Sequence, residues 1–233
     1  EHIETTFKVG ITRKSIKDSG NNYWVCTNNG ILVSRNYSEG NNLEVSYLPG
    51  GVPDIKDVVE GQNGYIYCVS SSGLFRTLDG GKTWTNFRGK IPGMPLGSWV
   101  PQIRASRFNA GEAFVVANDY RRGDFKPYIL KSEDLGISWS NISNDLPENG
   151  TVHTIEQDFV NADLLFAGTE FGVYFSANGG NQWIQLKSGI PTISVKDIAI
   201  QERECDLVLA SFGRGFYILD NYAPLREIAL ATA

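Results

Sequence analysis

The sequence predicts an all-β fold in which short antiparallel sheets of four strands repeat along the chain. Three observations support this prediction. A turn pattern, Ser/Thr-x-Asp/Asn-x-Gly-x-x-Trp, occurs three times, and a decayed copy without Trp precedes it. The four copies start at residues 34, 77, 132 and 176, at intervals of 43, 55 and 44 residues. Between them lie short apolar runs split by Gly turns, as in β-hairpins. A period of roughly 40–50 residues is typical of one blade of a β-propeller.

The repeated turn has a local physical explanation. An Asp or Asn side chain bonds backbone N–H groups of its own turn, Ser or Thr adds a second such bond, and Gly accepts a positive φ. The Trp packs between neighbouring sheets. Because Asn178 replaces Asp in the last copy, we interpret these residues as structural rather than as catalytic acids or calcium ligands. The defining residues are Thr77, Asp79, Gly81 and Trp84; Ser132, Asp134, Gly136 and Trp139; and Ser176, Asn178, Gly180 and Trp183.

The strand candidates divide the chain into five units within a single domain, residues 1–233. Each unit is expected to hold strands A, B, C and D, with the Asp turn between C and D. The fifth unit has candidates for A, B and C but neither an Asp turn nor a strand D. The tail 223–233 is expected to form a short helix or to lead into a following module. The units span about 8–48, 54–88, 99–143, 152–186 and 195–220.

Two arrangements would complete the propeller. In the first, the stretch Ile3–Val9 supplies the missing strand D of unit five and closes a five-blade ring. In the second, the chain is a portion of a larger propeller. Open first and last blades would leave exposed strand edges, which invite aggregation. Closure, or another chain or segment that completes the propeller, is therefore expected.

Composition excludes several classes of function. The net charge is −5 with scattered Lys and Arg, which does not favour nucleic acid. No apolar run reaches the roughly 18 residues that a membrane-spanning helix needs. His2 and His153 lie far apart, and the three cysteines show no metal spacing, so we expect no metal and no cofactor. The cysteines are interpreted as buried apolar side chains, with a disulfide left open; they are Cys26, Cys68 and Cys205.

The turns resemble the Asp-box, or bacterial neuraminidase repeat. The longer stretch 98–226 is similar to the sortilin-like propellers of bacterial exported proteins that are often labelled glycosyl hydrolases. Three segments carry this likeness, 124–132, 164–173 and 211–226, the last with Gly213-Arg214-Gly215. The resemblance implies a location outside the cytoplasm and favours a C-terminal portion of a longer propeller. It is specific for architecture and nearly silent about activity.

The Asp turns direct the search for a binding site to the opposite face of the propeller. In a blade, the B–C and D–A connections share one face (below, the B–C face), and the A–B and C–D connections share the other. We predict a site on the B–C face, with aromatics suited to sugar stacking. The alternatives are that its charges pair with one another across blades, and that Trp99 is a buried strand start. The candidate binding residues are Arg122, Asp124, Glu170, Arg214, Tyr120 and Trp99.

No catalytic constellation is placed by a motif. The arginine cluster and Arg-Ile-Pro signature of sialidases are missing, and the acids near strand A, Asp57, Glu156 and Asp197, follow no pattern. A glycosidase needs two carboxylates roughly 5–10 Å apart in a cleft. The sequence therefore favours a non-enzymatic binding or scaffold module that engages a protein or a glycan. The alternative is a glycoside hydrolase, or part of one, that uses rim carboxylates.

Overall fold

The computed structural model describes residues 11–35, 43–46, 48, 50, 54–62, 64–70, 73–87, 91–187 and 189–232. Within them the chain is almost entirely β-structure, with one 3₁₀ turn, η2 (Tyr120–Arg122), and one helix, α1 (Leu225–Thr232). The prediction of an all-β fold of antiparallel sheets is confirmed, and so is the short C-terminal helix. The segment Ile3–Val9 lies outside the described residues, so its predicted role in closure stays untested.

The strands form five antiparallel sheets, each built from strands consecutive in the chain. Among the described residues, four sheets have four strands and the fifth has three, which agrees with the prediction that unit five has no strand D of its own. The first two sheets comprise β1 (Thr12–Lys17), β2 (Tyr23–Thr27), β3 (Gly30–Ser34) and β4 (Leu43–Ser46), then β5 (Ile55–Glu60), β6 (Ile66–Ser70), β7 (Gly73–Thr77) and β8 (Thr85–Asn86). The third comprises β9 (Trp99–Ala105), β10 (Ala113–Asp119), β11 (Asp124–Ser132) and β12 (Ser140–Asn141). The last two comprise β13 (Val152–Gln157), β14 (Leu165–Thr169), β15 (Gly172–Ser176) and β16 (Ile184–Leu186), then β17 (Val195–Gln201), β18 (Asp206–Ser211) and β19 (Phe216–Leu219).

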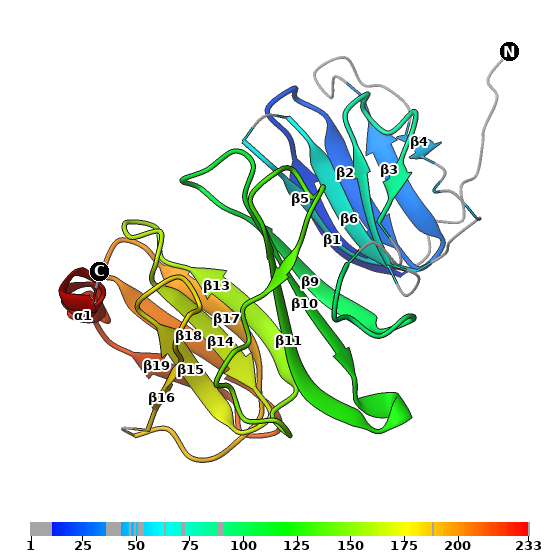
Figure 1. Ribbon diagram of the computed structural model, residues 1–233. Coiled ribbons are helices and arrows are strands. Elements are labelled where there is room, and N and C mark those ends of the chain that lie inside the picture. The colour runs from blue at the N-terminus through cyan, green and yellow to red at the C-terminus, as the bar shows by residue number, and fades with distance from the viewer. Residues whose placement is uncertain are drawn as a thin grey trace, which may run out of the picture.

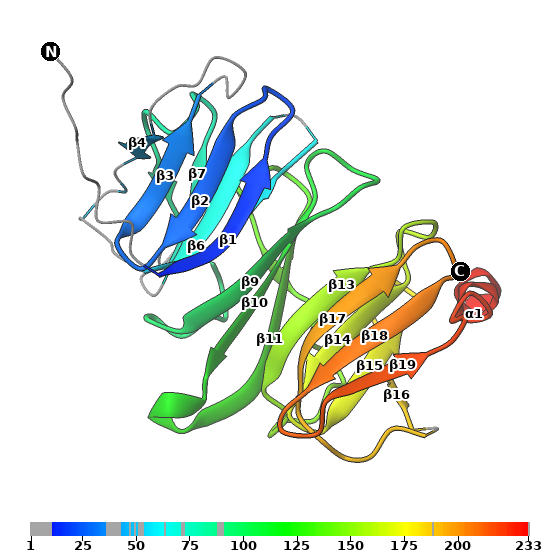
Figure 2. The ribbon, with the colours of Figure 1, turned by 180° about the vertical axis from the view of Figure 1, so that it is seen from behind.

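The sheets follow one another around a common centre. The first and second lie at one end of the molecule, the fourth and fifth at the other, and the third lies between them (Figures 1 and 2). The first strand of each sheet contacts the first strand of the next, in the order β1, β5, β9, β13 and β17. No contact of similar extent joins β17 back to β1 among the described residues.

The first strand of each sheet, called the inner strand below, carries an irregularity in its register. In all five sheets the register of the inner strand shifts near its start, for example between Ile55 and Asp57. The Asp57 carboxylate then accepts a bond from the backbone N–H of Ile103 in the next sheet, at 3.2 Å. Gln102 Oε1 likewise accepts from the N–H of Ile155, at 2.6 Å. In each case a buried backbone N–H of one sheet donates to a side chain of the preceding sheet, so these bonds stabilise the stacking of sheets.

Aromatic pairs fill the spaces between sheets. Trp84 of the second sheet packs edge-on against Trp24 of the first, with ring centroids 6.1 Å apart. Trp24 is the second residue of its strand, and the corresponding residues of the next three sheets are also aromatic and buried. Each lies in one cluster with an aromatic residue from further along the chain: Tyr67 with Trp139, Phe114 with Trp183, and Phe166 with Tyr222.

The turns at 77–84, 132–139 and 176–183 share one set of hydrogen bonds. In the third, the N–H of Gly180 donates to Ser176 Oγ at 2.8 Å, and the N–H of Gln182 donates to Asn178 Oδ1 at 2.9 Å. Equivalent bonds occur in the first two turns. Gly180 has φ +92°, and a Cβ there would come within 2.8 Å of the Ile142 side chain in the preceding sheet. The turn thus lets the backbone approach the neighbouring sheet closely enough for Trp183 to pack.

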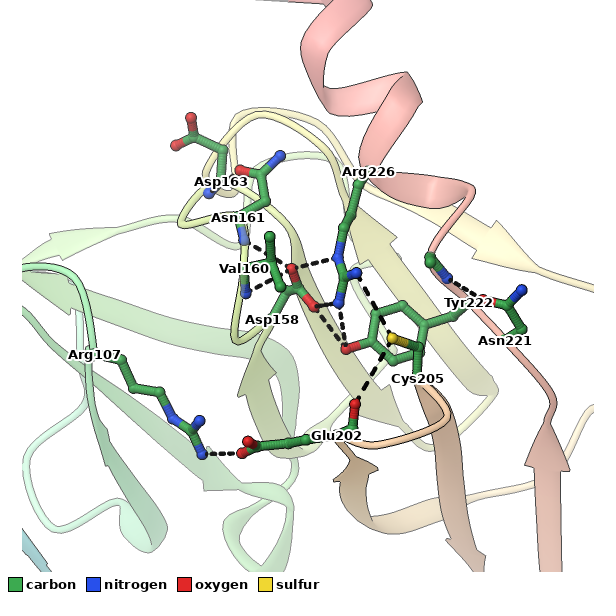
Figure 3. A network of polar contacts seen from close by, with 11 residues as sticks. Arg107, Asp158, Val160, Asn161, Asp163, Glu202, Cys205, Asn221, Tyr222 and Arg226 are labelled. Atoms are coloured by element: carbon green, nitrogen blue, oxygen red, sulfur yellow. Dashed lines mark hydrogen bonds and ion pairs between the residues drawn. The ribbon is translucent and has the colours of Figure 1, made fainter.

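After the third strand of the fifth sheet there is no such turn among the described residues. A buried ion pair is found there instead. Below, Asp158, Tyr222 and Arg226 are called the C-terminal lock (Figure 3). Tyr222 packs edge-on against Phe166, with centroids 5.0 Å apart, as Trp84 does against Trp24. Its hydroxyl donates to Asp158 at 2.6 Å, and Arg226 donates two bonds of 2.8 Å to the same carboxylate. The lock holds the chain after β19 against the fourth sheet.

Two further predictions concern the burial of the cysteines and the lack of a membrane-spanning helix. Cys26, Cys68 and Cys205 are free thiols. Cys26 and Cys68 are fully buried, as predicted, whereas Cys205 is only half-buried, contrary to the prediction. Burial raises the pKa of Cys26 to about 12. Among the described residues, no helix combines the length and the apolar character that crossing a bilayer requires.

Candidate functional site

A hollow of about 620 Å³ opens on the B–C face, where the third, fourth and fifth sheets meet. Four partly exposed aromatic residues line it: Tyr120, Phe125, Phe171 and Phe212. Polar groups complete the lining, namely Asn149, Thr151, His153, Glu170 and Lys196. Because the aromatic side chains come from three sheets and remain exposed together, we define this aromatic hollow as the candidate site.

Glu170 is the predicted residue at the centre of the polar part. Glu170 Oε2 lies 2.9 Å from His153 Nε2, 3.2 Å from Ser194 Oγ and 3.4 Å from Lys196 Nζ. Burial raises the pKa of the Glu170 carboxyl, but the bond from His153 and the charge of Lys196 outweigh it, so the net pKa lies below its usual value.

The ring of His153 contacts both Glu170 and Lys196. Its Nε2 also lies 2.9 Å from Lys196 Nζ, so this nitrogen donates to Glu170 or accepts from Lys196 according to the tautomer. Burial is the largest influence on its pKa and lowers it, and Lys196 lowers it further. The bond to Glu170 raises the pKa of His153, but the net pKa lies below its usual value, which favours the neutral ring.

The backbone fixes this cluster through one repeated contact. The N–H of Glu170 donates to the carbonyl of Thr151, just before β13, and the N–H of Phe212 donates to the carbonyl of Ser194, just before β17. Glu170 and Phe212 therefore occupy the same position in consecutive sheets. A carboxylate and a phenyl ring are in this way placed on adjacent B–C turns beside one hollow.

The insertion between β10 and β11 contributes fewer residues to the hollow than the sequence predicted. Arg122 pairs with Asp119 at 2.7 Å, and Asp124 accepts a bond from the Tyr128 hydroxyl at 2.6 Å. That bond is the largest influence on the Asp124 pKa and holds it below its usual value. Of this segment's predicted residues, only Tyr120 lines the hollow. Among the described residues, no hydrogen bond or ion pair joins Arg122, Asp124, Glu170 and Arg214 to one another, so the alternative of a ring of mutual pairs is not seen there.

Trp99 and Arg214 lie apart from the hollow. Trp99 is partly exposed at the start of β9, and the cations of Lys56 and Arg121 lie over its ring at 4.2 and 4.8 Å. A sugar would compete with these cations for the ring. Arg214 is exposed on the turn between β18 and β19 and does not line the hollow.

Seven residues of the site were not predicted from the sequence: Phe125, Asn149, Thr151, His153, Phe171, Lys196 and Phe212. Two of them could have been found. His153 and Lys196 occupy the second position of their inner strands, as Arg13 and Lys56 do, and these four line a central cavity of about 350 Å³. The phenylalanines carry no comparable signal, because nothing in the sequence around them distinguishes an exposed Phe from other apolar residues.

The carboxylates near the inner strands are mostly held by cations. Asp57 pairs with Lys14, and Glu156 accepts a bond from Arg104 at 2.9 Å. Burial is the main influence that raises the Glu156 pKa; Asp197 raises it further, against the effect of Arg104. Glu156 and Asp197 line one small cavity together. Among the described residues, no group of three or more His, Cys, Asp or Glu side chains could hold a metal ion.

Comparison with known proteins supports the architecture. No family model matches the chain, and no curated protein is similar to it in sequence. Solved structures are similar in fold. An ancestral GH74 enzyme aligns with a TM-score of 0.69 at 18% identity, over 87% of this chain and 27% of that chain. An extracellular domain from B. thetaiotaomicron, ascribed to a one-component system, aligns with a TM-score of 0.69 at 16% identity, over 94% and 28%. YCF48 bound to a D1 peptide aligns with a TM-score of 0.61 at 13% identity, over 91% and 65%.

These similarities show the fold alone, because every identity is low. They confirm the prediction of a β-propeller architecture. The chain spans little more than a quarter of the GH74 enzyme and of the extracellular domain. The similar structures include an enzyme and a protein that binds a peptide, so the fold does not separate the two predicted functions.

Proposed function

We propose that this chain is a non-enzymatic binding module of an exported protein, which engages a protein or glycan partner through the aromatic hollow. The observation that carries the proposal is the grouping of four exposed aromatic rings around one cluster, Glu170, His153 and Lys196. Exposed apolar groups with a few converging polar atoms are typical of binding surfaces. The hollow holds a single carboxylate, whereas glycoside hydrolysis requires two.

We further propose that the three turns are Asp-box turns and that the chain is related to sortilin-like propellers. The shared hydrogen bonds of Ser or Thr and of Asp or Asn support the first part. The location outside the cytoplasm follows from the resemblance and is supported by the similar extracellular domain.

A glycoside hydrolase is the second candidate. One observation favours it: Glu156, with its raised pKa, shares a small cavity with Asp197. A raised pKa suits a general acid, and a neighbouring carboxylate suits a nucleophile or base. The bond from Arg104 to Glu156 opposes this role, because it stabilises the ionised form that cannot donate a proton.

The two functions are separated by binding and hydrolysis assays on the same variants. The chain is screened against arrays of oligosaccharides and peptides, and its best ligand is titrated by calorimetry. Phe171→Ala is expected to weaken binding at least about tenfold, which is 1.4 kcal/mol. Phe108→Ala is the matched control, because Phe108 is similarly exposed but lies on the β9–β10 connection at the opposite face. Hydrolysis of any glycan that is lost in Glu156→Gln and kept in Phe171→Ala would establish the enzyme instead.

A further inference from the structure

The central cavity of about 350 Å³ borders the aromatic hollow, and one residue of every inner strand lines it in the same way. In each strand this is the residue directly before regular pairing resumes after the shift in register. The five residues are Arg13, Lys56, Pro101, His153 and Lys196. Four of them have basic side chains and none is acidic, so the irregular register gathers cations at one level of the cavity.

These cations outnumber the carboxylates that they contact. Arg13 and Lys56 both pair with a single carboxylate, that of Asp54, and Lys196 pairs with Glu170. Three cations therefore share two carboxylates at the mouth of the central cavity on the B–C face. The side chains of Arg13 and Lys196 are 37% and 39% exposed, so a ligand in solution can reach both of them.

The acids of the central cavity lie further along the inner strands and are already engaged. Asp57 pairs with Lys14, and Arg104 pairs with Glu156. Asp197 accepts bonds from a hydroxyl and from a backbone N–H of its own strand. The cavity is therefore polarised, with the excess of positive charge at its mouth and the acids deeper inside.

The aromatic hollow beside this mouth favours an apolar side chain over a sugar. The rings of Phe125, Phe171 and Phe212 have no polar atom, and a sugar hydroxyl buried against them would lack a hydrogen-bond partner, which is costly. The polar groups of the hollow are largely used within the protein. Thr151 donates its hydroxyl to a backbone carbonyl at 3.3 Å, and Glu170 accepts bonds from its own neighbours.

We propose that the partner is an acidic peptide segment, whose apolar side chain enters the aromatic hollow while a neighbouring Asp or Glu side chain is bound by Arg13 and Lys196. This inference rests on the proposed function, because it names the partner class of the same site. His153 and Lys196 line both the hollow and the central cavity, so the two side chains of the peptide stand within about two residues, roughly 7 Å of extended chain. Arg and Lys form strong charge-assisted hydrogen bonds with carboxylates, and complementary charge selects partners.

The test uses capped peptides, so that side chains supply their only carboxylates. An array of short acetylated peptide amides carries one Leu or Phe and one Glu at every pair of positions in a Gly/Ser background. The best binder is titrated against the whole chain by fluorescence anisotropy, beside the same peptide with Gln in place of Glu. The Glu peptide is expected to bind at least about tenfold more tightly than the Gln peptide. This preference should be lost at about 1 M salt, where the screening length falls to about 3 Å.

Variants of the chain separate the mouth from the hollow. Arg13→Gln is expected to weaken binding of the Glu peptide by at least about fivefold and to leave the Gln peptide unchanged. Arg13→Lys keeps the charge and should keep most of the preference. Lys17→Gln is the matched control, because Lys17 is an exposed cation at the other end of the same strand; it should change neither affinity. Phe171→Ala should weaken both peptides equally, since both carry the apolar side chain.

The outcomes distinguish this inference from the proposed function. Equal affinity for the two peptides, or a preference for Glu that survives in Arg13→Gln, overturns the acidic partner and leaves the aromatic hollow as the binding site. Binding that Phe171→Ala leaves unchanged overturns both. Absence of binding by every peptide in the array also overturns the inference. In that case an oligosaccharide whose binding is weakened by Phe171→Ala would keep the hollow as the site and assign it to a glycan.

Discussion

The Asp turn at 176–183 and the C-terminal lock perform the same packing task with different interactions. Each delivers an aromatic ring, Trp183 or Tyr222, to an aromatic residue in the second strand of the preceding sheet. The turn does so through hydrogen bonds among residues within four positions of one another. The lock uses Asp158 and Arg226, which are 68 residues apart in the chain. Hydrogen bonds within a short turn and an ion pair between distant residues can therefore both position an aromatic ring between two sheets.

Loss of the aromatic ring itself should have the largest effect. Trp183→Ala is expected to destabilise the chain by about 3–5 kcal/mol, because it leaves a cavity between the third and fourth sheets. Tyr222→Phe keeps the ring of the lock and should cost about 2 kcal/mol, because it removes one hydrogen bond to a buried charged carboxylate. Urea unfolding measures both free energies. Equal losses in the two variants would contradict the view that the ring matters most.

The ion pair of the lock should come next. Burial raises the pKa of Asp158, but the bonds from Arg226 and Tyr222 outweigh it and hold the pKa below its usual value. Its side chain is 0% exposed. Arg226→Met leaves this carboxylate buried without its cation, which typically costs about 3 kcal/mol. Arg203→Met, which breaks the exposed pair with Glu204, should change the free energy of unfolding by less than about 0.5 kcal/mol.

The hydroxyl of the Asp turn should contribute less than the lock. Ser176→Ala removes the acceptor of the Gly180 N–H and leaves that buried donor unpaired, at an expected cost of about 1–2 kcal/mol. Ser138→Ala is the matched control, because its hydroxyl bonds Asp134 at the exposed side of the second turn. If the two variants lose equal stability, the buried hydroxyl has no special role.

The smallest effect should appear only in acid. Bonds from Ser138, first its side chain and then its backbone, hold the pKa of Asp134 below its usual value. A carboxyl with a depressed folded-state pKa adds stability above its unfolded pKa, near 3.8, and loses it as pH falls through the folded value. Asp134→Asn, which copies Asn178 of the third turn, should therefore flatten the loss of stability below about pH 4. Unfolding free energies between about pH 2 and 6 measure the slope; an unchanged slope would contradict the assignment.

The fold was readable from the sequence because its signals are local. Hydroxyl, Asp or Asn, Gly and Trp stand within eight residues of one another, and each is required by a turn that those residues themselves build. The hollow was only partly readable. Glu170 and Tyr120 were found because they lie on predicted B–C connections, whereas Phe125, Phe171 and Phe212 acquire meaning only when three sheets bring them together.

The sequence by itself determined the all-β class, the repeating turns and the lack of an Asp turn after the third strand of the fifth unit, because periodicity and turn chemistry depend on neighbouring residues. Only the tertiary structure decided which charges pair, which aromatics share one hollow, and that Tyr222 takes the place of a turn tryptophan. Those outcomes depend on the contact between residues such as Asp158 and Arg226, and nothing in the local sequence of either residue specifies the other.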